Sequence, residues 1–201
     1  MGDVLAKTYV LLGTEPREIV CRLAGTTEIA EITAWRRQTK HRDNDAVDAL
    51  EFAKHSTKRW SFYESSKRAM SSLARAKARI KREPKAELAF LAVLTADWAP
   101  KRVLGFTLFR RSWCNHIVVD FIASHPANNE SAAREVKGVL RATLLAITEV
   151  ASALRVTRIL GEATDTSAEK YAHIFKLKKV EDLFVIETTV WRKFRAAARR
   201  T

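Results

Sequence analysis

The hydrophobic pattern of the first part of the chain is mainly helical. One strand is predicted over 17–23, where apolar and polar residues alternate. Apolar residues then recur at helical spacing, as in Ile29, Ile32 and Trp35. Helices are therefore predicted over 28–39, 46–54 and 65–82, the last with a strongly basic outer face.

From residue 86 the pattern changes to short apolar runs separated by turns, which is typical of strands. Amphipathic segments predict two further helices between the later strands. The strands are predicted over 86–95, 103–110, 116–124, 156–161 and 182–187, and the helices over 131–154 and 167–177. This order predicts an α/β (α+β) fold class with a mixed central sheet flanked by helices. The first three of these strands should form an antiparallel meander, and the two later strand–helix–strand units should add parallel pairs.

The length of 201 residues suits a single domain, 1–201, with a basic tail from about residue 191. No apolar run is long enough to cross a membrane, and the first residues lack the continuous apolar segment of a signal peptide. Cys21 and Cys114 both lie in apolar, strand-like runs and are interpreted as buried free thiols. Together these features favour a cytoplasmic protein.

The formal net charge of +13 suggests what kind of partner the protein has, because it attracts anionic molecules over long distances. Many of the basic residues belong to the segment 65–82 and to the C-terminal tail. Nucleic acid, ribosome-like particles, acidic proteins and phosphate-rich cofactors all qualify as partners, and charge alone does not choose among them. Trp60, Phe62 and Tyr63 precede the basic segment and could stack on bases, but anchoring a helix to the core is the simpler interpretation.

A candidate site lies where the strand 116–124 is followed by the helix that starts at Gly138. The N-terminus of a helix is a frequent phosphate site, because its first N–H groups lack partners and its dipole favours negative charge. Gly138 would allow a phosphate to approach the backbone closely. Basic side chains close to this point are Arg134, Lys137 and Arg141.

Titratable residues on the same strand are candidates for acid–base chemistry. Asp120 and His116 are four positions apart, so both should project to one face, opposite to Val119 and Phe121. Either could remove a proton from a nucleophile. The alternative for Asp120 is a carboxylate that reaches solvent at a strand edge. Glu162, at the end of the next strand, is a further candidate base on equal terms.

Other classes of site find no support in the sequence. It contains no Gly-x-Ser-x-Gly elbow, P-loop or dinucleotide fingerprint. His41, His55 and His173 have no partners at metal-ligand spacing, and two isolated cysteines do not form a structural zinc site. The sequence therefore predicts no metal site.

The stretch Ile122-Ala123-Ser124-His125-Pro126 and the helix after it resemble the GNAT acyltransferase superfamily. In that family the central strand ends in an apolar-x-Val-x-Pro stretch, splays from its neighbour and offers backbone groups to the pantetheine arm of acetyl-CoA. A loop at the following helix N-terminus then holds the pyrophosphate. The resemblance implies a GNAT-like acyl-CoA N-acyltransferase fold. The implied cofactor-binding residues are Ile122, Ala123, Ser124, Arg134, Lys137, Gly138, Val139 and Arg141.

Both sequence motifs of the family are incomplete in this chain. Leu140 stands where the pyrophosphate loop has its second glycine or alanine, and Glu135 stands where it has arginine or glutamine. The family's later tyrosine can protonate the leaving thiolate, but Tyr171 lies one position early, which is a rotation of about 100° on a helix. Tyr171 is nevertheless the candidate general acid.

The resemblance implies an N-acetyltransferase that transfers an acetyl group from acetyl-CoA to an amine of unknown identity. Tyr171 would act as the acid, and Asp120, His116 or Glu162 as the base. The alternative is a non-catalytic GNAT-fold protein that binds nucleic acid or an acidic protein through its basic surfaces. A homodimer is left open.

Overall fold

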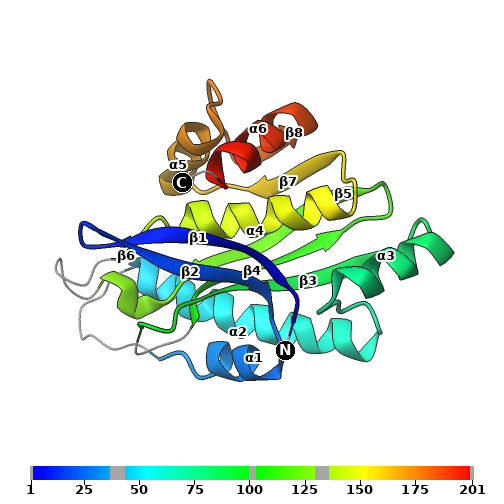
Figure 1. The fold of residues 1–201 in the computed structure, drawn as a ribbon, viewed down its shortest axis with the longest axis horizontal. Coiled ribbons are helices and arrows are strands. Elements are labelled where there is room, and N and C mark those ends of the chain that lie inside the picture. Colours follow the sequence, from blue (N-terminus) through cyan, green and yellow to red (C-terminus); the bar gives the residue numbers. More distant parts are fainter. Residues whose placement is uncertain (1, 37–43, 100–102, 130–135, 200–201) are drawn as a thin grey trace.

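The computed structural model describes residues 2–36, 44–99, 103–129 and 136–199. Its centre is an eight-stranded sheet with the order β6-β1-β2-β3-β4-β5-β7-β8. Neighbouring strands are antiparallel throughout, except that β5 and β7 are parallel. The predicted mixed sheet flanked by helices is confirmed (Figure 1).

From residue 86 onward the predicted strands are confirmed to within about two residues. The helix predicted over 131–154 is wrong at its start, because Val136–Lys137 forms a short strand and the helix begins at Val139. The strands are β1 Val4–Leu12, β2 Glu15–Leu23, β3 Leu88–Thr95, β4 Val103–Arg111, β5 His116–Ser124, β6 Val136–Lys137, β7 Arg158–Glu162 and β8 Leu183–Glu187. The antiparallel meander β3–β4–β5 and the parallel pair β5–β7 are confirmed. The second expected parallel pair is wrong, because β8 returns antiparallel to β7. Strand β1, which the pattern does not predict, forms a hairpin with β2.

The helices differ more from the prediction than the strands do. They are α1 Thr26–Thr33, α2 Asn44–Ser65, α3 Leu73–Arg82, α4 Val139–Ala153, α5 Asp165–Phe175 and α6 Thr188–Ala198, with a short 3-10 turn at Pro126–Asn129. The predicted helix over 65–82 is α3 only from Leu73, because Ala69 forms a bridge with Ala89 of the sheet. The basic segment from about 191 forms most of α6. The predicted helical residues 37–39 and 131–135 lie outside the described part of the chain.

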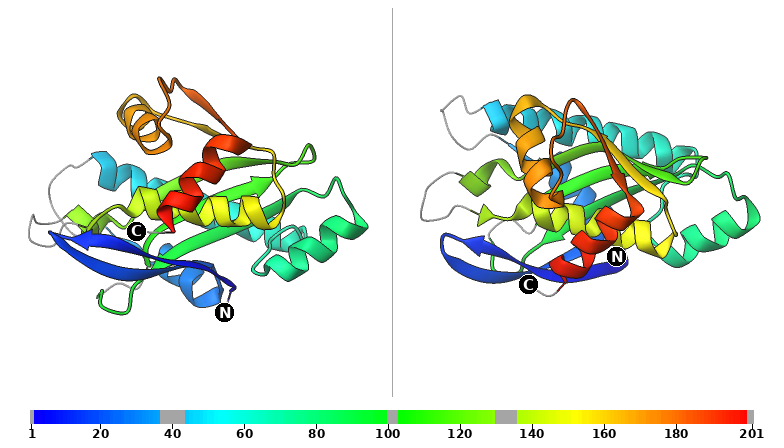
Figure 2. Two further views of the ribbon diagram at one scale, coloured as in Figure 1. Left: turned by 45° about the horizontal axis from the view of Figure 1, so that its top comes forward. Right: turned by 90° about the horizontal axis from the view of Figure 1, so that it is seen from above.

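Helices cover both faces of the sheet. Helices α1 and α2 lie on one face, α4 crosses the other, and α6 packs on the outside of α4 (Figures 1 and 2). The principal core lies on the α4 side and includes Phe90, Phe109, Ile147 and Trp191. The second core lies on the α2 side and includes Trp35, Trp60, Phe106 and Leu108.

Three sequence expectations concern single side chains of these layers. Cys21 is buried as expected, and burial raises the pKa of its thiol to about 12. Cys114 is exposed in the β4–β5 turn, so its predicted burial is wrong. Trp60 and Tyr63 are buried and anchor α2, whereas Phe62 is exposed.

None of the described helices is both long and apolar enough to cross a bilayer.

Candidate active site

The pairing of β5 with β7 is short. It joins His116 to Arg158, Ile117 to Ile159 and Val118 to Leu160, whereas β5 continues to Ser124. The consequence is visible in the burial of β5. Its residues from Val118 to Ile122 are all half-buried, although β3 and β4 beside it are buried almost throughout. The second half of this central strand therefore has an open edge on the side of β7.

The N-terminus of α4 lies at the end of this open edge. Gly138 precedes the helix with φ of 94°, a left-handed conformation that favours glycine. Val139 packs against Gly105 of β4, which pairs with Ser124 at the end of β5. The first intrahelical hydrogen bond runs from the Ala142 amide to the Gly138 carbonyl, 3.0 Å. The first amides of an α-helix have no acceptor within the helix itself.

The Leu140 side chain does not project into solvent at this helix start. It is half-buried and packs against the principal core, so it follows the apolar face of α4. Lys137 and Arg141 are exposed on either side of Gly138, which keeps positive charge near the helix start. Lys137 pairs with Leu11 of β1, which fixes the segment that leads into α4. Arg134 lies outside the described residues.

The three strand-end residues have different environments. Ile122 is half-buried against the principal core, Ala123 is buried, and Ser124 is exposed. Their neighbour on one side is β4, and the His125 amide continues that pairing with a 2.8 Å hydrogen bond to the Leu104 carbonyl. On the other side the β7 ladder has already ended.

Asp120 is the extra residue of a β-bulge. Phe109 of β4 pairs with Val119 and Leu108 pairs with Phe121, which leaves Asp120 without an opposite residue. The bulge changes which residues share a face. Val119 packs against the principal core, whereas Phe121 packs in the second core against Phe52 of α2. The expected common face of Val119 and Phe121 is therefore wrong.

The Asp120 carboxylate is buried between two arginines. Its side chain is only 5% exposed, and Oδ1 accepts a hydrogen bond from Arg110 Nε at 3.2 Å and lies 3.4 Å from Arg59 Nη1. Oδ2 is buried without a hydrogen-bond partner among the described residues. Burial raises the pKa of Asp120 above its ordinary value, although both arginines lower it. The alternative of a solvated carboxylate at a strand edge is thus wrong.

Sequence reasoning missed both arginines. Arg110 lies in the strand next to β5, so the register of the β4–β5 hairpin would have brought it close to Asp120. Arg59 comes from α2, and nothing in the local pattern places that helix over β5. Glu162 lies at the exposed end of β7, near enough that its charge also raises the pKa of Asp120.

His116 is not part of this cluster. It lies at the start of β5, about 13 Å along the strand from Asp120, and its Nδ1 is 3.3 Å from Cys114 Sγ. Tyr171 lies in the principal core on α5, 6% exposed, with its ring 4.6 Å from that of Phe184. Phe184 in turn covers Gly161 near the end of β7. Burial raises the pKa of Tyr171 to about 12, so the phenol holds its proton at neutral pH.

The combination of a parallel pair that ends early and a helix start beside the open strand is the arrangement that the GNAT resemblance implies. The catalytic and cofactor-binding roles of the named residues stay predictions.

No protein-family model matches the sequence, and no curated protein matches it either.

Several solved structures are similar to this chain, with TM-scores below 0.5. Mycobacterium smegmatis RimJ in complex with CoA-disulfide is 13% identical, with 96% of this chain and 94% of that chain covered and a TM-score of 0.45. A protein from Desulfovibrio desulfuricans assigned to the GNAT family is 10% identical, with 84% and 98% covered and a TM-score of 0.46. Nourseothricin acetyltransferase is 20% identical, with 42% of this chain covered and a TM-score of 0.35. That match spans 48% of nourseothricin acetyltransferase, about half of its length.

Proposed function

We propose that the protein is an acyl-CoA-dependent N-acyltransferase that transfers an acetyl group from acetyl-CoA to an amine. The observation that carries this proposal is the early end of the β5–β7 ladder beside the start of α4. An extended ligand with amide groups can pair with the open edge of β5, as a further strand would. Its phosphates can then reach the helix start, whose dipole favours negative charge.

The residues at this point fit coenzyme A in shape and charge. A side chain at Gly138 would be strained by the positive φ, and glycine leaves the backbone there accessible. Lys137 and Arg141 add positive charge on the exposed side of the helix start. Leu140, whose bulk would hinder a phosphate if it pointed outward, packs against the core. Bound acetyl-CoA would supply a thioester as the acyl donor.

Direct transfer requires that the amine loses a proton and that the departing sulfur gains one. The amine nitrogen bonds to the thioester carbon, and the carbon–sulfur bond breaks. Glu162, exposed at the end of β7, and Asp120, with a raised pKa, are the two candidate proton acceptors. Tyr171, protonated because its pKa is about 12, is the candidate donor to sulfur. His116 lies too far along β5 to share this role.

Two measurements test the proposal. Calorimetry should detect saturable acetyl-CoA binding with a dissociation constant of about 1 μM to 1 mM, the usual range for enzyme substrates. Release of the coenzyme A thiol, followed with a thiol reagent, should then depend on an added amine from a panel of polyamines, amino acids and peptide N-termini. Absence of any heat at millimolar acetyl-CoA would reject the proposal. Binding without thiol release from any amine would reject catalysis and keep the cofactor site.

A further inference from the structure

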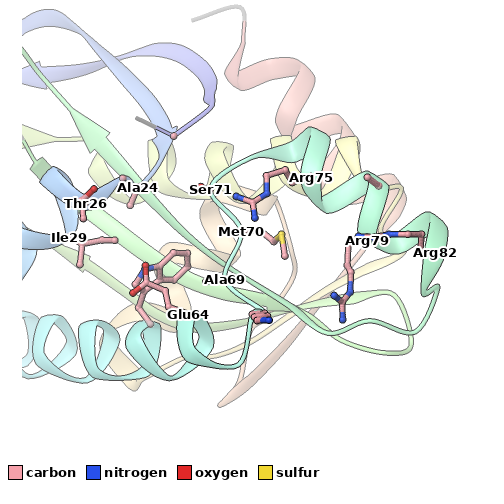
Figure 3. A pocket seen from close by; sticks show the side chains of 15 residues that line it. Ala24, Thr26, Ile29, Glu64, Ala69, Met70, Ser71, Arg75, Arg79 and Arg82 are labelled. Atoms are coloured by element: carbon pink, nitrogen blue, oxygen red, sulfur yellow. The ribbon is translucent and has the colours of Figure 1, made fainter.

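A cavity lies away from the candidate active site, at the other end of the sheet. It measures about 590 Å³ and lies between the start of α1, the C-terminal end of α2 and one face of α3 (Figure 3). Its floor includes Ala69 and Met70. The Met70 amide donates a hydrogen bond to the Ala89 carbonyl at the start of β3, opposite Ala69. The start of α4 instead lies at Gly105, near the beginning of β4. Because β3 and β4 are antiparallel and Leu88 pairs with Arg111, these two places are at opposite ends of the strands.

Positive charge dominates the lining of this cavity, which we call the α3 groove. Its charged lining residues are Lys67, Arg75, Arg79, Arg82 and the single carboxylate Glu64. Arg79 is paired with Glu83 at 2.7 Å. Within the described part of the chain no ion pair joins Lys67, Arg75 or Arg82 to a carboxylate. The groove thus gathers cations that repel one another, and the pair between Arg79 and Glu83 offsets only one of them.

The arginines form one row on the helix. Arg75, Arg79 and Arg82 are spaced four and three residues apart, so they share one face and span about 10 Å along α3. Figure 3 shows Arg75 and Arg79 extending from α3 on the side of the cavity. The apolar residues Leu73 and Ile80 lie on a different face and pack against the principal core. The folding of α3 therefore does not require the arginine row.

Buried donors without acceptors line the same groove. Trp60 is 2% exposed, and its indole Nε1 has no hydrogen-bond partner among the described residues. Arg79 Nε is also buried without a partner there. A buried donor that lacks an acceptor costs free energy, which a ligand rich in acceptor oxygens can recover. The groove thus offers cations and N–H donors, with Glu64 as its one competing carboxylate.

We propose that the α3 groove binds the phosphate backbone of a nucleic acid. A row of cations along an open groove suits a linear chain of phosphates better than a single small anion, which needs donors that converge on one point. Guanidinium groups pair with phosphate oxygens through two parallel hydrogen bonds. The net charge of +13 adds long-range attraction for such a polyanion. This site is separate from the proposed acyl transfer and does not depend on it.

The same helix supplies a matched control. Lys77 and Lys81 are exposed on α3 but lie on the face away from the arginine row, and they do not line the groove. Arg75→Glu with Arg82→Glu and Lys77→Glu with Lys81→Glu change the net charge of the protein equally. A difference between them therefore reports the groove and not the total charge.

Fluorescence anisotropy with a short labelled single-stranded RNA tests the proposal between about 50 mM and 200 mM salt. We expect R75E/R82E to weaken binding at least about tenfold and to lower the salt slope by about one per lost phosphate contact. The K77E/K81E variant should lose less than about threefold. The neutral R75Q/R82Q variant repeats the test if charge reversal unfolds the protein, which circular dichroism detects.

Four outcomes would overturn the proposal. They are no RNA binding at the lowest salt, equal losses in the two charge-reversal variants, and competition by polyglutamate as strong as that by unlabelled RNA. The fourth is full competition by a mononucleotide at the same phosphate concentration, which would assign the groove to a small phosphorylated ligand. Loss of RNA binding that is confined to the groove variants, with weak competition by polyglutamate and by the mononucleotide, supports binding of a nucleic-acid backbone.

Discussion

Glu149 of α4 and Arg199 at the end of α6 form a two-point ion pair. Arg199 Nε and Nη2 each donate a hydrogen bond of 2.6 Å to a different carboxylate oxygen of Glu149. Arg195 adds a third hydrogen bond of 2.9 Å. Glu149 is buried, so this carboxylate holds the basic C-terminal helix against the helix whose start forms the candidate site.

Glu149→Gln should therefore destabilise the protein. A buried acceptor that loses its charge in front of two arginines costs about 1–3 kcal/mol of the free energy of unfolding. The matched control is Glu18→Gln, which breaks an exposed ion pair with Lys7 of 3.0 Å and should cost less than about 1 kcal/mol. Urea denaturation of both variants makes the comparison. Equal costs would show that the clamp contributes no more than a surface pair.

The raised pKa of Asp120 predicts a pH dependence of stability. In the folded protein burial favours the protonated carboxyl, whereas the unfolded chain titrates near the ordinary value of 3.8. Between these two pKa values the folded state binds more protons than the unfolded state. The free energy of unfolding should therefore fall as pH rises from 3.8 through this window, and then stay level.

Asp120→Asn should remove this dependence. The difference in unfolding free energy between wild type and variant then decreases with rising pH over the same window. Thermal unfolding in a series of buffers of equal ionic strength measures it. A difference that increases with pH would mean that the arginines outweigh burial and that the pKa is lowered.

The sequence predicted the architecture better than the site. Strand β5 and the start of α4 could be predicted because a mostly apolar strand ends in a turn and Gly138 precedes a long amphipathic face. Strand β1 was missed because its exposed face breaks the apolar run. The bulge at Asp120 could not be predicted from the sequence, because it depends on the hydrogen-bond register with β4 and not on residue type.

Two further features of the site depend on the tertiary structure and not on the local sequence. The ion pair between Arg59 and Asp120 joins residues of α2 and β5 that are distant in sequence. The early end of the β5–β7 ladder could not be predicted either, because it depends on how the two strands pair and not on residue type.

Tyr171→Phe separates a catalytic from a structural role for the phenol. The variant keeps the ring contact with Phe184, so its stability should change little. If the phenol protonates the leaving thiolate, the turnover number should fall about 100-fold with acetyl-CoA affinity unchanged. Since the pKa of Tyr171 is about 12, the phenol of the wild type keeps its proton at every pH well below that value. Its activity should therefore not decline there through loss of this proton. Tyr9→Phe, at an exposed tyrosine of β1, is the control; unchanged turnover in Y171F would assign Tyr171 to the core.

The contact between Gly105 and Val139 gives a direct test of the cofactor site. A Cβ at position 105 would lie 2.7 Å from Val139 Cγ1 and 3.0 Å from the Ala123 carbonyl oxygen, so alanine there should push the start of α4 away from the end of β5. If phosphates rest on this helix start, Gly105→Ala should weaken acetyl-CoA binding at least about tenfold, which equals about 1.4 kcal/mol.

The second substitution in this test is Val139→Ala, which removes the closest obstacle. The double variant should recover part of the lost affinity, because the two residues are in contact and their effects are not additive. Calorimetry on wild type, both single variants and the double variant measures the coupling. If Gly105→Ala binds acetyl-CoA as tightly as wild type while its thermal unfolding shifts, the helix start moves without affecting the ligand. The phosphates would then have to bind elsewhere.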